Sequence, residues 1–242
     1  MIRITKNINH KLKQLIKESY EFIKNDFSIK NDFKRINHIN IFHKDWLKVE
    51  PTQLVELTKL SKDIIKLLER EYDINSNTIF SLGFINAPPK CNNQHFHIDY
   101  NGKTDTYFIP LVDLNNTNGT EYVKFNNIKL NLHYFEDLKK ISEKYINRDQ
   151  VINNFESLNI DKSNYEFKIL NAKSYSMVKM PYYIFHRGKI NESNYNRIMF
   201  QIVISESNDA SISNDYIIND SELDEDSDKV TKILEQRTKL II

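Results

Sequence analysis

Two segments near the start of the chain carry apolar residues at helical spacing. One face of residues 11–26 holds five apolar side chains: Leu12, Leu15, Ile16, Tyr20 and Ile23. Residues 52–71 repeat this spacing with leucine and isoleucine, directly after Pro51. Spacing of three and four residues predicts amphipathic helices, and proline favours the first turn of a helix. Between these segments, residues 34–48 alternate and are rich in isoleucine and aromatic residues, which predicts strands.

From Thr78 the pattern changes to short apolar stretches separated by turns. In chain order these stretches are TIFSLGFIN, HFHIDY, TDTYFIPLVDL, TEYVKF, YEFKIL, SYSMVKM, YYIFH and RIMFQIVIS. Several short strands at such close spacing predict an all-β sandwich or barrel. Residues 134–157 interrupt the series with a polar, helical pattern, which predicts an insertion between two strands.

These patterns predict three parts. Residues 1–77 form N-terminal helices and strands that pack on the core, and residues 78–205 form the β core with a helical insertion near 134–157. Residues 206–228 contain no lysine or arginine, which predicts a solvated acidic segment. The third part, residues 206–242, is therefore expected to be an acidic tail that ends in a short helix.

Composition excludes several classes of protein. Hydrophobic residues make up 40% of the 242 residues and charged residues 28%, which predicts a soluble globular protein. A formal net charge of +1 gives no evidence for nucleic-acid binding, and no apolar run is long enough for a membrane span. Four glycines without a glycine-rich phosphate loop weigh against nucleotide-binding folds. The single cysteine, Cys91, excludes a cysteine-based zinc site and an internal disulfide, so we expect a cytoplasmic location. Nothing in the sequence predicts the oligomeric state.

The HFHIDY stretch contains candidate metal ligands. His95, His97 and Asp99 alternate, so that in a strand all three would project from one face. Downstream, an apolar stretch is predicted to end as a strand at His186, and Arg197 opens the next strand. Two histidines and one carboxylate on one face of an octahedron leave three positions open, as in non-haem Fe(II) oxygenases. A buried arginine at the mouth of a small barrel needs an anion, and its planar fork suits a carboxylate.

At these residues the sequence resembles the Fe(II)/2-oxoglutarate-dependent dioxygenases, most closely the phytanoyl-CoA dioxygenase-like group. That family has a His-x-Asp pair, a long gap, a distal histidine near a glycine-containing loop, and an arginine about ten residues later. His97, Asp99, His186 and Arg197 match this pattern. FIPLVDLNNTNGTEYV also resembles the family strand that runs into an Asn-Gly turn.

The resemblance covers roughly Thr78 to Ser205 and implies a mainly β fold with flanking helices around a double-stranded β-helix, the jelly roll of cupin-like proteins. It implies that His97, Asp99 and His186 bind Fe(II), and that Arg197 binds the co-substrate 2-oxoglutarate. It assigns no catalytic residue beyond the metal ligands.

The implied activity is hydroxylation of a C–H bond with dioxygen, which releases succinate and CO2. A small-molecule substrate is favoured over a macromolecule, although no residue identifies it. The retained carboxylate of Asp99 disfavours halogenation, because related halogenases carry a small residue there. The alternative is a catalytically inactive jelly roll that serves as a binding or interaction protein with a vestigial metal site.

The sequence departs from the family in its co-substrate contacts. Gly188 stands where relatives carry a small hydroxyl residue, so the second 2-oxoglutarate contact is open, and Tyr107 is the candidate. His95 is interpreted as a flanking residue, since a cupin with a His-x-His start would need a glutamate where Tyr100 and Asn101 stand.

Overall fold

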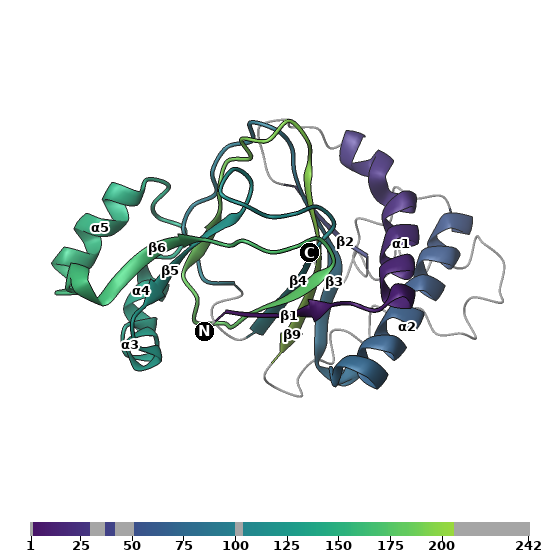
Figure 1. The fold of residues 1–242 in the computed structure, drawn as a ribbon, viewed down its shortest axis with the longest axis horizontal. Helices are drawn as coiled ribbons and strands as arrows, with labels where there is room; N and C mark the ends of the chain where they lie inside the picture. The colour runs from purple at the N-terminus through teal and green to yellow at the C-terminus, as the bar shows by residue number, and fades with distance from the viewer. Residues whose placement is uncertain (1, 30–36, 42–50, 100–103, 206–242) are drawn as a thin grey trace, which may run out of the picture. The chain divides into compact units, whose positions relative to one another are not determined.

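The computed structural model describes residues 2–29, 37–41, 51–99 and 104–205 (Figure 1). The predicted acidic tail and C-terminal helix lie outside these residues. The chain divides into two compact units. The first unit consists of Met1–Asn7, Asp32–Asn37 and Ile85–Met199, and the second of Ile8–Asn31, His38–Phe84 and Phe200–Ile242.

The second unit contains the two predicted helices, α1 (His10–Ile29) and α2 (Pro51–Tyr72), which lie side by side (Figure 1). Their buried positions follow the helical spacing of the sequence: Leu12, Ile16 and Ile23 on α1, and Leu57, Ile64 and Leu68 on α2. Asn9 caps α1, because its Oδ1 accepts a hydrogen bond from the backbone N–H of Leu12 at 2.8 Å. Both helix predictions are confirmed. None of the helices in the described ranges is long and apolar enough to cross a membrane.

The described strands form two sheets. The larger has the order β1-β7-β4-β9-β3-β2 and the smaller the order β6-β5-β8. The strands of the larger sheet are β1 (Arg3–Asn7), β2 (Asn37–Asn40), β3 (Ile79–Ala87), β4 (Thr104–Pro110), β7 (Ser176–Met180) and β9 (Arg197–Ser205). Those of the smaller sheet are β5 (Thr120–Phe125), β6 (Tyr165–Ile169) and β8 (His186–Gly188). β1 was not predicted from the sequence. It pairs antiparallel with β7.

Three α-helices lie between β5 and β6 in the chain, and the first of them begins earlier than the insertion expected near 134–157. They are α3 (Ile128–His133), α4 (Phe135–Ile141) and α5 (Arg148–Ser157), which lie beside β5 and β6 (Figure 1). Val123 and Phe125 of β5 bury their side chains in a cluster with Phe155 of α5. We call the face of the small sheet that carries Val123 and Phe125 the outer face.

The opposite face of the small sheet, which carries Tyr122, is the inner face. Tyr122 packs against a second cluster that includes Phe108 of β4, Val178 of β7 and Met199 of β9. Side chains alternate along a strand, so Tyr122 and Lys124 share the inner face while Val123 faces the insertion. The candidate site lies on this inner face.

Candidate metal centre

A backbone bridge brings His97 and His186 together. The N–H of His97 donates to the carbonyl of His186 at 2.7 Å, and the N–H of His186 donates to the carbonyl of His97 at 2.9 Å. The pairing is an isolated bridge, so the predicted strand around His97 is reduced to this one residue. β8 begins at His186, and the prediction that a strand ends there is wrong because a turn closes just before it, from the N–H of Ile184 to the carbonyl of Pro181.

Asp99 joins the two histidines. Its Oδ1 lies 3.4 Å from His97 Nε2 and 3.7 Å from His186 Nε2, and the imidazole centroids are 4.5 Å apart. One ligand atom from each residue lies within 4.8 Å of the others. The structure therefore gathers the three residues that the sequence predicted as ligands, and we call them the triad.

Each triad side chain is held by a hydrogen bond at an atom other than the one it turns toward its triad partners. His97 Nδ1 lies 2.8 Å from the carbonyl of His95, and His186 Nδ1 lies 3.0 Å from the carbonyl of Ile184. Each Nδ1 donates its proton to a carbonyl, which leaves the Nε2 lone pair free to bind a metal. The Oδ2 of Asp99 accepts a hydrogen bond from Thr106 Oγ1 at 3.1 Å. No pattern in the sequence marks Thr106, and none indicates that His95 acts through its carbonyl.

The pKa values of the triad side chains are shifted by burial and by their neighbours. Burial disfavours the charged form of Asp99, but the two histidines and the Thr106 hydroxyl hold its pKa well below the usual range. Burial lowers the pKa of His186, so this imidazole is neutral. For His97, burial is outweighed by the hydrogen bond and charge of Asp99, and its pKa is raised. One carboxylate and two imidazoles turned toward one point fit a divalent transition metal with open coordination positions.

Arg197 is buried as predicted, and its guanidinium has no carboxylate partner among the described residues. Its side chain is 1% exposed, and burial lowers its pKa to about 10, so it stays charged at neutral pH. Nη1 donates to three carbonyls, those of Asn118 at 2.7 Å, Lys189 at 3.2 Å and Gly119 at 3.3 Å. Nε is buried without any partner. A buried cation with an unused N–H is suited to a ligand anion.

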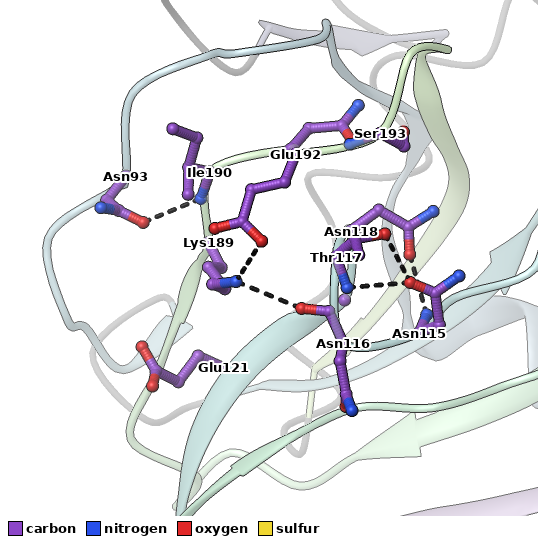
Figure 2. A network of polar contacts seen from close by, with 12 residues as sticks. Asn93, Asn115, Asn116, Thr117, Asn118, Glu121, Lys189, Ile190, Glu192 and Ser193 are labelled. Carbon is purple, nitrogen blue, oxygen red and sulfur yellow. Dashed lines mark hydrogen bonds and ion pairs between the residues drawn. The ribbon is translucent and has the colours of Figure 1, made fainter.

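The carbonyls that accept hydrogen bonds from Arg197 belong to two loops. Asparagine and lysine side chains hold these loops by further hydrogen bonds (Figure 2). Asn118 Oδ1 accepts from the N–H of Asn115 at 2.8 Å, and Lys189 Nζ donates to the carbonyl of Asn116 at 3.1 Å. Position 119 requires glycine, because a Cβ there would collide with the Asn115 carbonyl oxygen at 2.8 Å. The Asn-Gly turn thus holds acceptors for the arginine.

Strand register shows how far the carbonyls that bind Arg197 lie from the triad along the small sheet. Tyr122 stands opposite His186, and Thr120 stands opposite Gly188. The carbonyls that bind Arg197 come directly before Thr120 and directly after Gly188. At about 3.4 Å per residue, they lie roughly 10 Å along β5 from the His186 row. Gly188 has no side chain, so β8 places no side chain on the inner face between the two groups.

Tyr107 does not face the triad. It stands opposite Lys179 on β7, and Lys179 Nζ lies 5.4 Å from the centre of its ring. Its neighbour Thr106 points to Asp99, and adjacent residues of a strand point to opposite faces. Tyr107 is therefore not the second contact of a ligand bound between the triad and Arg197.

Solved structures of other proteins resemble this chain. No protein-family model matches the sequence, and no curated protein matches it. SnoK, a non-haem α-ketoglutarate-dependent carbocyclase from nogalamycin biosynthesis, has a similar structure with a TM-score of 0.51 and 13% identity, over 84% of this chain and 78% of SnoK. AviO1 from Streptomyces viridochromogenes matches with a TM-score of 0.48 and 11% identity, over 85% and 89% of the two chains. HygX from Streptomyces hygroscopicus, solved with nickel and 2-oxoglutarate bound, matches with a TM-score of 0.48 and 10% identity, over 84% and 82%. The predicted mainly β fold with flanking helices and a jelly-roll core is thereby confirmed as the fold of this chain, shared with SnoK.

Proposed function

We propose that the protein is an Fe(II)- and 2-oxoglutarate-dependent oxygenase that hydroxylates a C–H bond of a small organic substrate. The reaction would be R–H + 2-oxoglutarate + O2 → R–OH + succinate + CO2, in which every atom is accounted for. The observation that carries the proposal is the triad, whose two Nε2 atoms and one carboxylate oxygen turn toward one point. The shared fold with SnoK, described as α-ketoglutarate dependent, supports it.

The triad residues would hold the iron. Bound iron supplies the redox chemistry and the open positions at which 2-oxoglutarate and dioxygen bind. The carbonyls of His95 and Ile184 fix the imidazole tautomers, and Thr106 fixes the carboxylate. The low pKa of Asp99 keeps that ligand ionised, and burial of His186 keeps that ligand neutral.

Arg197 would bind the distal carboxylate of 2-oxoglutarate. Its unpaired Nε is available to donate a charge-assisted hydrogen bond, which is strong in a buried site. The three carbonyls on Nη1 hold the guanidinium in place before the ligand arrives. Because Gly188 has no side chain, β8 would place no side chain in the path of a co-substrate that extends from the triad to Arg197.

Metal and 2-oxoglutarate binding test the proposal. Titration calorimetry with Ni(II), an air-stable substitute for Fe(II), is expected to show one site, which His97→Ala and His186→Ala abolish. His95→Ala is the matched control, because it removes an exposed ring but keeps the carbonyl that orients His97. Arg197→Met should keep metal binding but lower the affinity for 2-oxoglutarate by at least about tenfold, which corresponds to the loss of one hydrogen bond to a charged group.

Turnover distinguishes the enzyme from the alternative. Anaerobically purified protein, given Fe(II), 2-oxoglutarate and then dioxygen, should form succinate slowly even without substrate. If the wild-type protein neither binds Ni(II) nor forms succinate, the chain is instead an inactive jelly roll with a vestigial site.

A further inference from the structure

A cavity of about 220 Å3 lies against the small sheet and the first helix of the insertion, within the first unit. Its lining mixes apolar and polar side chains, chiefly Tyr122, Lys124, Ile128, Asn131, Lys168 and Ile184. None of the triad residues lines it. Its relation to the triad follows instead from the register of the strands.

One row of residues crosses the inner face from the triad to the cavity. Tyr122 on β5 stands opposite His186 on β8 and opposite Lys168 on β6. Directly opposed residues project from the same face, and neighbouring strands lie about 4.8 Å apart. Tyr122 is therefore one strand away from a proposed iron ligand, and Lys168 is two strands away.

The cavity and Arg197 lie on opposite sides of the His186 row. Arg197 is held by carbonyls just before Thr120, whereas Lys124 comes two residues after Tyr122 on the same face. A co-substrate that extends from the triad to Arg197 would leave the Lys124 side free. The cavity is thus placed for the second organic molecule of the reaction.

The charge of the cavity favours an anion. Lys124 and Lys168 both pair with Glu166, at 3.0 and 2.8 Å. Two cations share one carboxylate, which leaves one positive charge at the rim. The apolar lining, including Ile128 and Ile184, suits the hydrocarbon part of a ligand.

Asn131 adds a hydrogen-bond requirement. This side chain is 5% exposed, and its Oδ1 is buried without a hydrogen-bond partner. A buried acceptor left unpaired is unfavourable, and a ligand hydroxyl or N–H in the cavity would satisfy it.

We propose that this cavity binds the organic substrate, and that the substrate is a small apolar molecule with an anionic group for Lys124 and Lys168 and a hydrogen-bond donor for Asn131. The ligand is a substrate only if the triad holds iron, so this inference rests on the proposed function in that respect. Binding itself needs no metal, and the two proposals can therefore fail separately.

A pair of probes of equal size tests the charge. Binding of 2-naphthoate and of neutral 2-naphthylmethanol to the full chain is measured by fluorescence titration at low salt. The anion should bind about fivefold more tightly, and Lys124→Met/Lys168→Met should erase this difference. Lys139→Met/Lys140→Met on α4 makes the same change of charge at residues that do not line the cavity and should preserve the difference, as should Arg197→Met. Equal affinity for the two probes, no binding of either, or a preference that follows Arg197 overturns the proposal.

A hydroxylated probe tests Asn131. The added hydroxyl of 6-hydroxy-2-naphthoate should improve binding about fivefold in the wild-type protein and not at all in Asn131→Leu. Asn131→Leu should also raise the melting temperature, since it removes an unpaired buried oxygen, and a misfolded variant would be recognised by a lower one. A hydroxyl without effect in the wild type, or an effect that survives in Asn131→Leu, overturns the Asn131 contact. Ni(II) binding is the separate measurement. If the wild-type protein does not bind Ni(II), the iron proposal is contradicted, whereas the probe results still test the cavity.

Discussion

The two faces of the small sheet use their charged residues differently. On the outer face, Arg187 donates from Nε and Nη2 to Glu121 Oε2 at 2.7 and 2.6 Å, and its guanidinium lies 4.5 Å from the centre of the Phe96 ring. Arg197 of β9, in the larger sheet, donates to carbonyls that adjoin the inner face next to β5 and β8, and this buried guanidinium has no carboxylate partner in the described part of the chain. His186 and Arg187 are neighbours, so the alternation of one strand separates a proposed metal ligand from a structural ion pair. The buried charges of the outer face are thus paired with each other, whereas the buried charge of Arg197 next to the inner face is left without a counter-charge.

The largest effect is expected from breaking the outer ion pair. Glu121 is 1% exposed, and Glu121→Gln leaves Arg187 buried without its counter-charge, which should lower the free energy of unfolding by about 3–5 kcal/mol. Urea denaturation measures this change. Glu166→Gln on the inner face is the control, because Glu166 pairs with two half-exposed lysines and its loss should lower the free energy of unfolding much less. Equal losses from both variants would contradict the contrast between the faces.

A smaller effect, on metal affinity rather than stability, is expected at Thr106. Thr106→Val keeps the shape of the side chain but removes the hydroxyl that holds Asp99 Oδ2, so Ni(II) affinity should fall by about 10–100-fold. Thr104→Val is a matched control on the same strand and face, since the Thr104 hydroxyl is buried without a partner. It should leave Ni(II) affinity unchanged. If both variants bind Ni(II) as the wild type does, Thr106 has no positioning role.

The sequence predicted part of this site because part of it is local. His97 and Asp99 are two residues apart and could be recognised together, and the family resemblance added His186 and Arg197. Thr106 could have been found only by knowing which face of β4 is turned to Asp99. The carbonyls of His95 and Ile184 leave no signal in the sequence, since any residue type provides a carbonyl.

Register explains most of what the sequence could not predict about the fold. β5 pairs with β6 and β8 across long stretches of chain, and a shift of one residue would move Tyr122 to the outer face. The row from His186 through Tyr122 to Lys168 exists only in the folded sheet. The helices α1 and α2 were predictable because their spacing is contained within each segment, whereas β1 was missed because its five residues show no clear alternation.

A methyl group at position 188 should separate co-substrate binding from metal binding. Gly188→Ala adds a side chain to the inner face between His186 and the carbonyls that hold Arg197. We expect 2-oxoglutarate affinity to fall by about tenfold through crowding, with little change in Ni(II) affinity. Calorimetry in the presence of Ni(II) measures both. Unchanged 2-oxoglutarate affinity would mean that the ligand does not pass over Gly188.

The smallest effect is expected from pH, and its direction follows from the two histidines. Burial lowers the pKa of His97, but Asp99 more than offsets this, so the folded pKa is above the usual value of about 6.5, whereas burial lowers that of His186. A metal binds only the neutral imidazole, so His97 is the ligand at which protons compete near neutral pH. Ni(II) affinity should therefore fall as pH decreases through the raised pKa of His97, by at most about tenfold per pH unit, and should level off above it.

The stability of the metal-free protein should change with pH in the opposite direction. The ion pair of protonated His97 with Asp99 contributes stability below about pH 6.5, and this stability is lost as pH rises through the folded pKa. Calorimetry and thermal unfolding between pH 6 and 8.5 should thus change in opposite directions at His97, and Ni(II) affinity that is flat over this range would show that another residue binds the metal.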